Sequence, residues 1–331
     1  MARIDGVAEF SGKISCRPRV VQFVDRNLGA RTGGSSEMVG WTHTQKKFFK
    51  YMSSGTARVV LANGTLRWSA PKQFNDPFDI QFDMHIEHVD KAKLIADVAN
   101  DLWLFYSRQS EYEPKNRLGY FVRDMSVKGP RLSEAEFRAA VQKGVTESLY
   151  EQQRRLPELH SWVRARLEKA LVLCLTEMPS NILMWAHYAD CHRGVVLEFS
   201  TLEASSWAAA RPVSYRERMP LLFDQEQLRQ FLSGCAVIDK DRFFLESFLT
   251  KSIDWKYERE WRVVWHATKE IDFEDTKFNP QELAGIYFGC RVDKKDCEDL
   301  VSLARKLNPE VQAWMGKKSL RTFAVEFDRF K

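Results

Sequence analysis

The stretch Trp255-Lys-Tyr-Glu-Arg-Glu-Trp-Arg-Val-Val-Trp265 decides how the fold is read, because its apolar residues alternate as in a half-buried strand. Successive side chains of a strand point to opposite faces. Trp261 and Val263 are therefore expected to be buried behind the strand. Two carboxylates and a guanidinium are expected to share the other face and to line one wall of a cleft: Glu258, Glu260 and Arg262. A surface strand that carries charges only for solubility would show the same pattern.

Composition places the chain among globular proteins of enzyme size. It has 331 residues, of which 44% are hydrophobic and 12% aromatic, including ten Trp. These values exclude disorder over most of the length. No apolar run approaches a membrane span. The first residues contain charged and polar side chains where a signal peptide needs an apolar segment, so we expect a cytoplasmic protein. The net charge of +5 permits contact with nucleic acid without requiring it.

No metal site is expected from the cysteines and histidines. The six cysteines do not form two close pairs, which a structural zinc site requires. His187 and His192 flank Cys191, but no second cluster of suitable spacing completes a ligand set.

The chain is expected to form a single mixed α+β catalytic domain over residues 41–331. Residues 1–40 show little periodicity and are expected to be a loosely ordered N-terminal extension. From about 90 to 170 apolar residues recur at helical spacing, which predicts a helical insertion. Strands do not alternate regularly with crossover helices, which argues against a doubly wound sheet.

The individual elements follow from periodicity, caps and turns. Strands are expected at Phe48–Met52, Thr65–Ser69, Leu171–Thr176, Gly194–Phe199, Val213–Tyr215, Trp261–Val264, Ile286–Phe288 and Thr322–Phe327. Helices are expected at Ser54–Leu61, Ser180–Asp190, Gln225–Phe231, Arg242–Thr250 and Lys294–Leu307, and Ser133–Glu136 is a helix-start signal inside the insertion.

Two further segments concentrate polar residues. In Ser69–Asp79 two prolines fix the backbone, and Asn75 and Asp76 are suited to a tight turn. The segment can be simply a tightly built corner, or Asp76 and Asp79 can lie at the edge of a pocket. Ser180–Gly194 predicts a short helix with an aromatic and imidazole stripe. Such a stripe can be core or a shelf for a planar ligand.

Three motifs, taken together, resemble the signatures of the bacterial domain-of-unknown-function family 2971. They are Leu66–Asp79, Met184–Asp190 with Arg193-Gly194, and Lys251–Arg262. The resemblance covers roughly residues 45–290. The family name supplies no reaction.

The order of these motifs also looks like that of a divergent ADP-ribosyltransferase, which implies a mixed, mostly antiparallel β core. It further implies that Glu260 stabilises the positive charge that develops on the ribose when nicotinamide leaves NAD. Glu258 would orient the acceptor or act as base, and His187 would be a third catalytic residue. The remaining residues implied to contact NAD are Lys50, Tyr51, Trp185, Tyr188, Arg193, Asn75 and Asp76. Lys50 and Tyr51 stand where better known transferases have Arg or His.

The leading hypothesis is thus an enzyme that uses NAD as a substrate and transfers ADP-ribose to a cytosolic nucleic acid or protein. A toxin or antiviral defence effector, with a regulatory partner protein, fits this chemistry. One alternative is a magnesium-dependent nuclease using Asp76, Asp79, Glu258 and Glu260, with Lys256 beside them. Another is a non-enzymatic module that binds nucleic acid or a partner through its basic surface and Trp residues.

Overall fold

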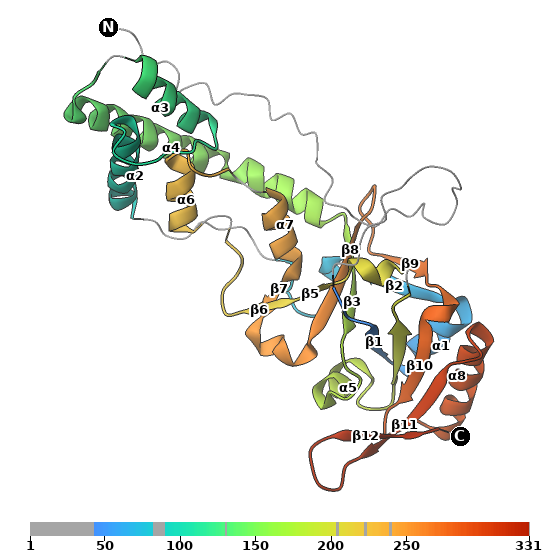
Figure 1. Ribbon diagram of the computed structural model, residues 1–331. Helices are drawn as coiled ribbons and strands as arrows, with labels where there is room; N and C mark the ends of the chain where they lie inside the picture. The colour runs from blue at the N-terminus through green and yellow to red at the C-terminus, as the bar shows by residue number, and fades with distance from the viewer. Residues whose placement is uncertain are drawn as a thin grey trace. The chain divides into compact units, whose positions relative to one another are not determined.

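The computed structural model describes residues 43–81, 90–129, 131–202, 205–221, 224–237 and 240–330 (Figure 1). The expected N-terminal extension, residues 1–40, lies outside them. The chain divides into two compact units. Among described residues, the helical unit contains 90–165, 220–221 and 224–246, and the sheet unit contains 43–81, 166–219 and 247–330, each within the ranges given above.

The described part of the sheet unit contains a ten-stranded sheet with the order β12-β11-β10-β4-β1-β3-β2-β9. β8 pairs with β3, and β5 pairs with β8. All these pairings are antiparallel except β10 with β11, so the fold is α+β with a mostly antiparallel sheet. The strands are β1 Lys47–Met52, β2 Thr65–Ser69, β3 Ala170–Thr176, β4 Val195–Ser200, β5 Arg211–Pro212, β8 Glu260–His266, β9 Phe273–Lys277, β10 Leu283–Phe288, β11 Gln312–Lys318 and β12 Val325–Arg329.

Short helices complete this unit. They are α1 Ser54–Asn63, α5 Ile182–Tyr188, α8 Lys294–Leu307 and the 3-10 turns Pro71–Gln73, Ser206–Ala209, Ile253–Glu258 and Pro280–Glu282. A separate parallel pair joins β6 Ser214–Arg216 to β7 Thr250–Ser252. The Ser53 side chain accepts a hydrogen bond from the Thr56 amide and so starts α1. Gly64, at φ +64°, ends α1, since glycine adopts this left-handed conformation without strain.

The sheet has two halves, and strands β1 and β3 lie where the halves adjoin. β1 pairs with β4 along its whole length, and β3 pairs with β8 along its whole length. Between β1 and β3 a single pair remains, Phe49 with Thr176. The two halves of the sheet are therefore joined over a short distance only, and side chains of both halves can line one pocket.

The core of the sheet unit combines strands and helices that are far apart in the sequence. Phe48, Leu197, Phe199, Ile286 and Phe288 are completely buried and pack with residues of α1 and α8. Val263 is completely buried in the same cluster, as the alternation in the sequence predicted, whereas Trp261 is only half-buried and packs against it. This packing fixes the position of β8.

The helical unit is built from α2 Lys91–Tyr106, α3 Arg117–Lys128, α4 Glu134–Leu167 and α6 Gln225–Leu232, and α7 Lys240–Leu249 begins in it. Leu94, Val98 and Leu102 are buried, as their spacing predicted. Ser133 and Glu136 bond each other at the start of α4. In the ranges that the structure describes, no helix is long and apolar enough to cross a membrane.

Three expectations about element boundaries were wrong. Helix α5 is capped by Asn181, not Ser180, because the Asn181 side chain accepts from the amides of Leu183 and Met184. β12 begins at Val325 rather than Thr322. Four strands were missed. β5 and β7 have only two and three residues, and β9 and β11 are half-exposed strands whose charged side chains give little apolar alternation.

Candidate functional site

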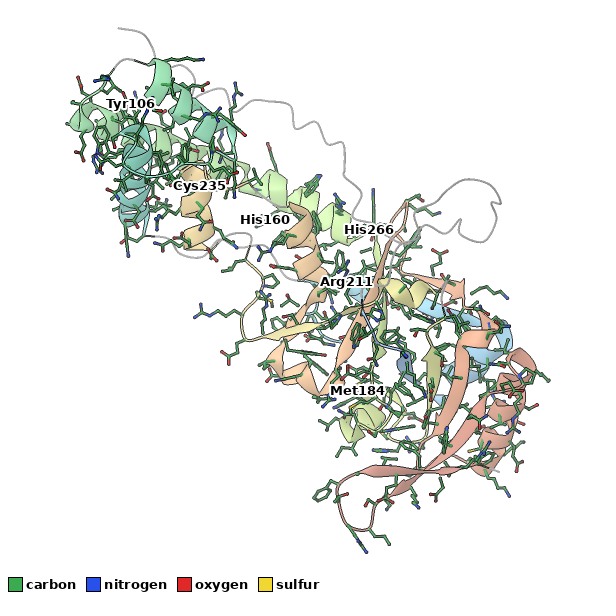
Figure 2. All side chains as sticks on the ribbon, in the orientation of Figure 1. Tyr106, His160, Met184, Arg211, Cys235 and His266 are labelled. Atoms are coloured by element: carbon green, nitrogen blue, oxygen red, sulfur yellow. The ribbon has the colours of Figure 1, made fainter. Side chains whose placement is uncertain are left out.

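A pocket of about 390 Å³ lies at the place where β1 and β3 separate. We call it the carboxylate pocket. Its walls come from β1, β2, β3, α5, the Gln73–Asp79 segment and the residues around β7 and β8. Met184 of α5, labelled in Figure 2, is among them. The polar lining residues include Lys50, Tyr51, Arg67, Asn75, Asp79, Cys174, His187, Tyr188, Lys251, Glu258 and Glu260.

A network of buried charges forms the floor of this pocket. Arg262 donates from Nε to one oxygen of Glu260 at 2.8 Å and from Nη2 to the other at 2.9 Å. The same Nη2 donates to Asp79 at 2.6 Å. Lys251 contacts Glu260 at 3.0 Å, Glu258 at 2.6 Å and Asp79 at 3.4 Å. Three carboxylates and two cations are thus held together with little access to water.

The backbone conformation that places Glu258 in the network was not predicted from the sequence pattern. It is not on strand β8: it ends a 3-10 turn, and the strand starts only at Glu260. Arg259 between them adopts a left-handed conformation, φ +45° and ψ +51°. The expectation of three charged side chains alternating along one strand was therefore wrong for Glu258. The reversal at Arg259 still brings both glutamates to the pocket.

The two glutamates differ in their partners. Both oxygens of Glu260 are bound to cations. Glu258 binds Lys251 with one oxygen and accepts a hydrogen bond from the Tyr188 hydroxyl with the other, at 2.6 Å. A hydroxyl is more easily exchanged for a substrate hydroxyl than a guanidinium is, because the charged bond is stronger. Glu258 is thus the more available of the two carboxylates.

The charges of the network shift the pKa values in opposite directions. Burial by itself would raise the pKa of Glu260, but Arg262 and Lys251 outweigh it and hold that pKa below its usual range. Burial raises the pKa of Glu258; Lys251 opposes this shift and the charge of Glu260 adds to it, and the pKa stays above its usual range. Burial would lower the pKa of Lys251, yet its three carboxylates raise it. We therefore take Glu260 as a permanent anion and Glu258 as the carboxylate that accepts a proton more readily.

Asp79 has one oxygen without a partner. Its Oδ2 binds Arg262 and Lys251, whereas no hydrogen-bond donor among the described residues reaches its buried Oδ1. A buried acceptor without a partner is costly. Because Asp79 lines the pocket, a donor on a bound ligand is the natural partner for this oxygen.

The first strand contributes Lys50 and Tyr51, both expected from the sequence to contact a ligand and both lining the pocket. The ammonium of Lys50 donates to the Cys174 carbonyl at 2.7 Å, and no described carboxylate forms an ion pair with it. The Tyr51 hydroxyl donates to the Met178 carbonyl at 3.1 Å, and burial raises the pKa of Tyr51. Lys50 is therefore the cation that is free to meet an anion.

Helix α5 places His187 and Tyr188 on the pocket wall. The imidazole of His187 is exposed and lies about 6.5 Å from the rings of Trp255 and Tyr257, measured between centroids. Burial, followed by the charge of Glu258, raises the pKa of Tyr188, so this phenol stays protonated. Asn75 also lines the pocket and bonds Tyr188. Helix α5, Glu258 and Glu260 thus line the same pocket.

Four residues expected in the site do not line the pocket. Arg262 is buried and touches the pocket only through its bonds to Glu260 and Asp79. Trp185 is completely buried, and its indole nitrogen donates to the Pro179 carbonyl at 2.7 Å, so it is part of the core. Arg193 is exposed and pairs with Asp190. Asp76 accepts from the Phe78 amide and shapes the turn. Spacing alone could not separate the two sides of α5, because both carry aromatic residues.

Lys251, Cys174 and Arg67 line the pocket but were not predicted as site residues. The sequence signals for Lys251 were its place after the apolar Phe248-Leu249 and its position at the start of the Lys251–Arg262 motif. A buried lysine needs carboxylate partners, and three lie beside it here. Throughout the described ranges, no group of three or more His, Cys, Asp or Glu side chains is arranged to hold a metal ion.

Comparison with known protein families identifies one segment. Residues 184–263 match a family model described as "Protein of unknown function (DUF2971)". The resemblance to domain-of-unknown-function family 2971 is thereby confirmed for the segment from α5 to β8, which contains Tyr188, Lys251, Glu258 and Glu260. No curated protein and no solved structure matches the chain.

Proposed function

We propose that the sheet unit is an ADP-ribosyltransferase that uses NAD as a substrate and modifies a nucleic acid or protein in the cytoplasm. The observation that carries this proposal is the carboxylate pocket, where β1, α5 and the Lys251–Glu260 segment converge between the two halves of the sheet. The proposal also includes a biological role as a toxin or an antiviral defence effector. A regulatory partner protein would then bind this chain.

Several features of the pocket suit the nicotinamide and ribose of NAD. Its volume of about 390 Å³ is in the range of small-molecule sites, roughly 300–1,000 Å³. The free Oδ1 of Asp79 needs a donor, which an amide or a hydroxyl of such a ligand supplies. Tyr51, Tyr188 and Phe49 provide ring surface on the wall. Lys50 is placed to meet a phosphate.

The charge of the network favours the transition state of this reaction. With all groups ionised, three carboxylates (Asp79, Glu258, Glu260) and two cations (Lys251, Arg262) leave one surplus negative charge. When the bond between ribose and nicotinamide breaks, its electron pair leaves with nicotinamide and positive charge develops on the ribose. A fixed negative surplus stabilises that charge more than it stabilises the neutral ribose.

The geometry leads us to assign the two glutamates differently from the sequence hypothesis. Glu258 is proposed to contact the ribose. It then takes the proton of the acceptor group while a lone pair of the acceptor forms the bond to the ribose that nicotinamide has left. Its raised pKa suits proton transfer. Glu260, bound to two cations, is proposed to hold Lys251 and Arg262 in position. His187, exposed at the pocket, is proposed to contact the acceptor.

The nuclease remains the second candidate, since Asp79, Glu258 and Glu260 do come together. Two observations make it the weaker one. Lys251 and Arg262 bind both oxygens of Glu260 and one oxygen each of Asp79 and Glu258, and Asp76, the fourth predicted ligand, does not line the pocket. The hypothesis of a non-enzymatic binding module does not explain why these charged side chains are buried together at a pocket.

The test is the release of nicotinamide from NAD by the purified protein, with and without cell extract. We expect release by the native protein and a fall of two to four powers of ten in turnover for Glu258→Gln, because the amide keeps the shape and loses the charge. Glu310→Gln, an exposed glutamate outside the pocket, is the matched control and should retain full activity. Magnesium-dependent cleavage of nucleic acid without NAD would instead support the nuclease.

A further inference from the structure

The helical unit contains a second cavity, of about 220 Å³, that the proposed reaction does not use. Helices α2, α3, α4 and α6 enclose it, and we call it the helical cavity. Leu102, Val122, Phe137, Val145 and Leu232 form its buried walls. Tyr106, labelled in Figure 2, stacks on Phe137 behind the wall, with ring centroids 4.5 Å apart.

The helical cavity lies between packed helices and opens to solvent at an edge where Arg117 and Phe121 are exposed. Cores are packed as densely as organic crystals, and voids larger than a water molecule are few. An apolar cavity of roughly 150 Å³ is already enough to bind benzene. The helical cavity is larger, so it has room for two fused rings or for a branched or medium-length hydrocarbon chain.

The wall is not uniformly apolar. The side chain of Arg117, at the first position of α3, lines the cavity and forms no ion pair with any described residue. Ser148 of α4 also lines it, and its hydroxyl has no partner in the part of the chain that the structure describes. Phe121, 40% exposed, lies on the same wall and offers ring surface at the edge of the cavity. A cation, a hydroxyl and an apolar interior together match a ligand with one anionic end.

We propose that the helical cavity binds a small monocarboxylate with an apolar body, its carboxylate at Arg117 and its hydrocarbon part between Leu102, Phe137 and Val145. The apolar body leaves water and fills the space between the helices. A guanidinium holds a carboxylate through two parallel hydrogen bonds, which distinguishes it from a neutral head group. This site is independent of NAD and of the carboxylate pocket.

Octanoate is a suitable probe, below its micelle concentration, with octanamide as the neutral analogue of equal length. Calorimetric titration of the full-length protein should show one site for octanoate and binding of octanamide weaker by about fivefold or more, because the amide loses the ion pair. Equal affinity for the two compounds, or no binding of either, overturns the proposal.

Two variants locate the site. Arg117→Gln should weaken octanoate binding to the level of octanamide, whereas Arg123→Gln, an exposed arginine on the same helix that does not line the cavity, should leave it unchanged. Ala140→Met, which places a side chain into the cavity, should abolish binding of both compounds. Undiminished binding by a folded Ala140→Met protein places octanoate elsewhere and overturns the assignment. Melting curves of each variant verify that it is folded.

Discussion

The carboxylate pocket and the helical cavity differ in what holds their walls in place. The pocket keeps Asp79, Glu258 and Glu260 apart from water by pairing them with Lys251 and Arg262. The cavity is held by apolar packing, and its one charged residue is exposed at the edge. Paired buried charges depend on every partner, whereas apolar packing tolerates change of shape. The same kind of substitution should therefore have very different effects at the two sites.

The largest difference is expected for the two arginines. Arg262→Met should lower the free energy of unfolding by about 3–5 kcal/mol, because it leaves the buried Glu260 and Asp79 with Lys251 alone. Arg117→Gln at the helical cavity should change it by less than about 0.5 kcal/mol, as an exposed substitution. Urea denaturation of both variants measures the difference. Similar values for the two would show that the buried network contributes nothing specific.

The next effect separates the two glutamates. Glu260→Gln should lower the free energy of unfolding by about 3 kcal/mol, because Arg262 loses its main anionic partner. Turnover per folded molecule should fall by about tenfold, less than in Glu258→Gln, because the charge of the network changes while the proposed contact of Glu258 with the ribose remains. The melting temperature and the nicotinamide release of each variant are measured on the same sample. An unaltered melting temperature with turnover reduced a hundredfold would return the catalytic role to Glu260, as the sequence suggested.

A third effect concerns pH and has opposite signs at the two glutamates. The pKa of Glu258 is raised on folding, so the native state holds a proton that the unfolded chain has released above about pH 4.3. Its contribution to stability therefore falls as pH rises from about 4.3 through the raised pKa. The lowered pKa of Glu260 contributes stability that is present above about pH 4.3 and is lost as pH falls through its folded pKa.

Denaturation of the native protein and of Glu258→Gln between pH 4 and pH 8 tests this sign. The native protein should lose stability relative to the variant as the pH rises, because only the native protein has the carboxyl group at position 258. A stability difference that stays constant over this range, or that grows with pH, would contradict the raised pKa of Glu258.

The sequence predicts different parts of the two sites. The helices that enclose the helical cavity follow from the spacing of Leu94, Val98 and Leu102, because helical periodicity is a local property. The cavity itself depends on how four helices pack, which no local pattern states. For the carboxylate pocket, residue types and motif order pointed to Glu258 and Glu260. Their difference in role depends on the left-handed turn at Arg259 and on the ion pairs of Lys251 and Arg262. Strand alternation contains neither of these features.

The smallest expected effect is a gain in stability at the helical cavity. Ala140→Met adds an unbranched side chain on α4 that can adapt to an irregular space, and methionine has a high helix propensity. It should raise the free energy of unfolding by about 0.5–1 kcal/mol, as cavity-filling substitutions commonly do. No polar group loses a partner in this variant, whereas every substitution in the carboxylate pocket removes one. Urea denaturation in the absence of added ligand is the measurement. A loss of 1–3 kcal/mol instead would indicate overpacking and would show that the cavity walls are as tightly fixed as the buried ion pairs.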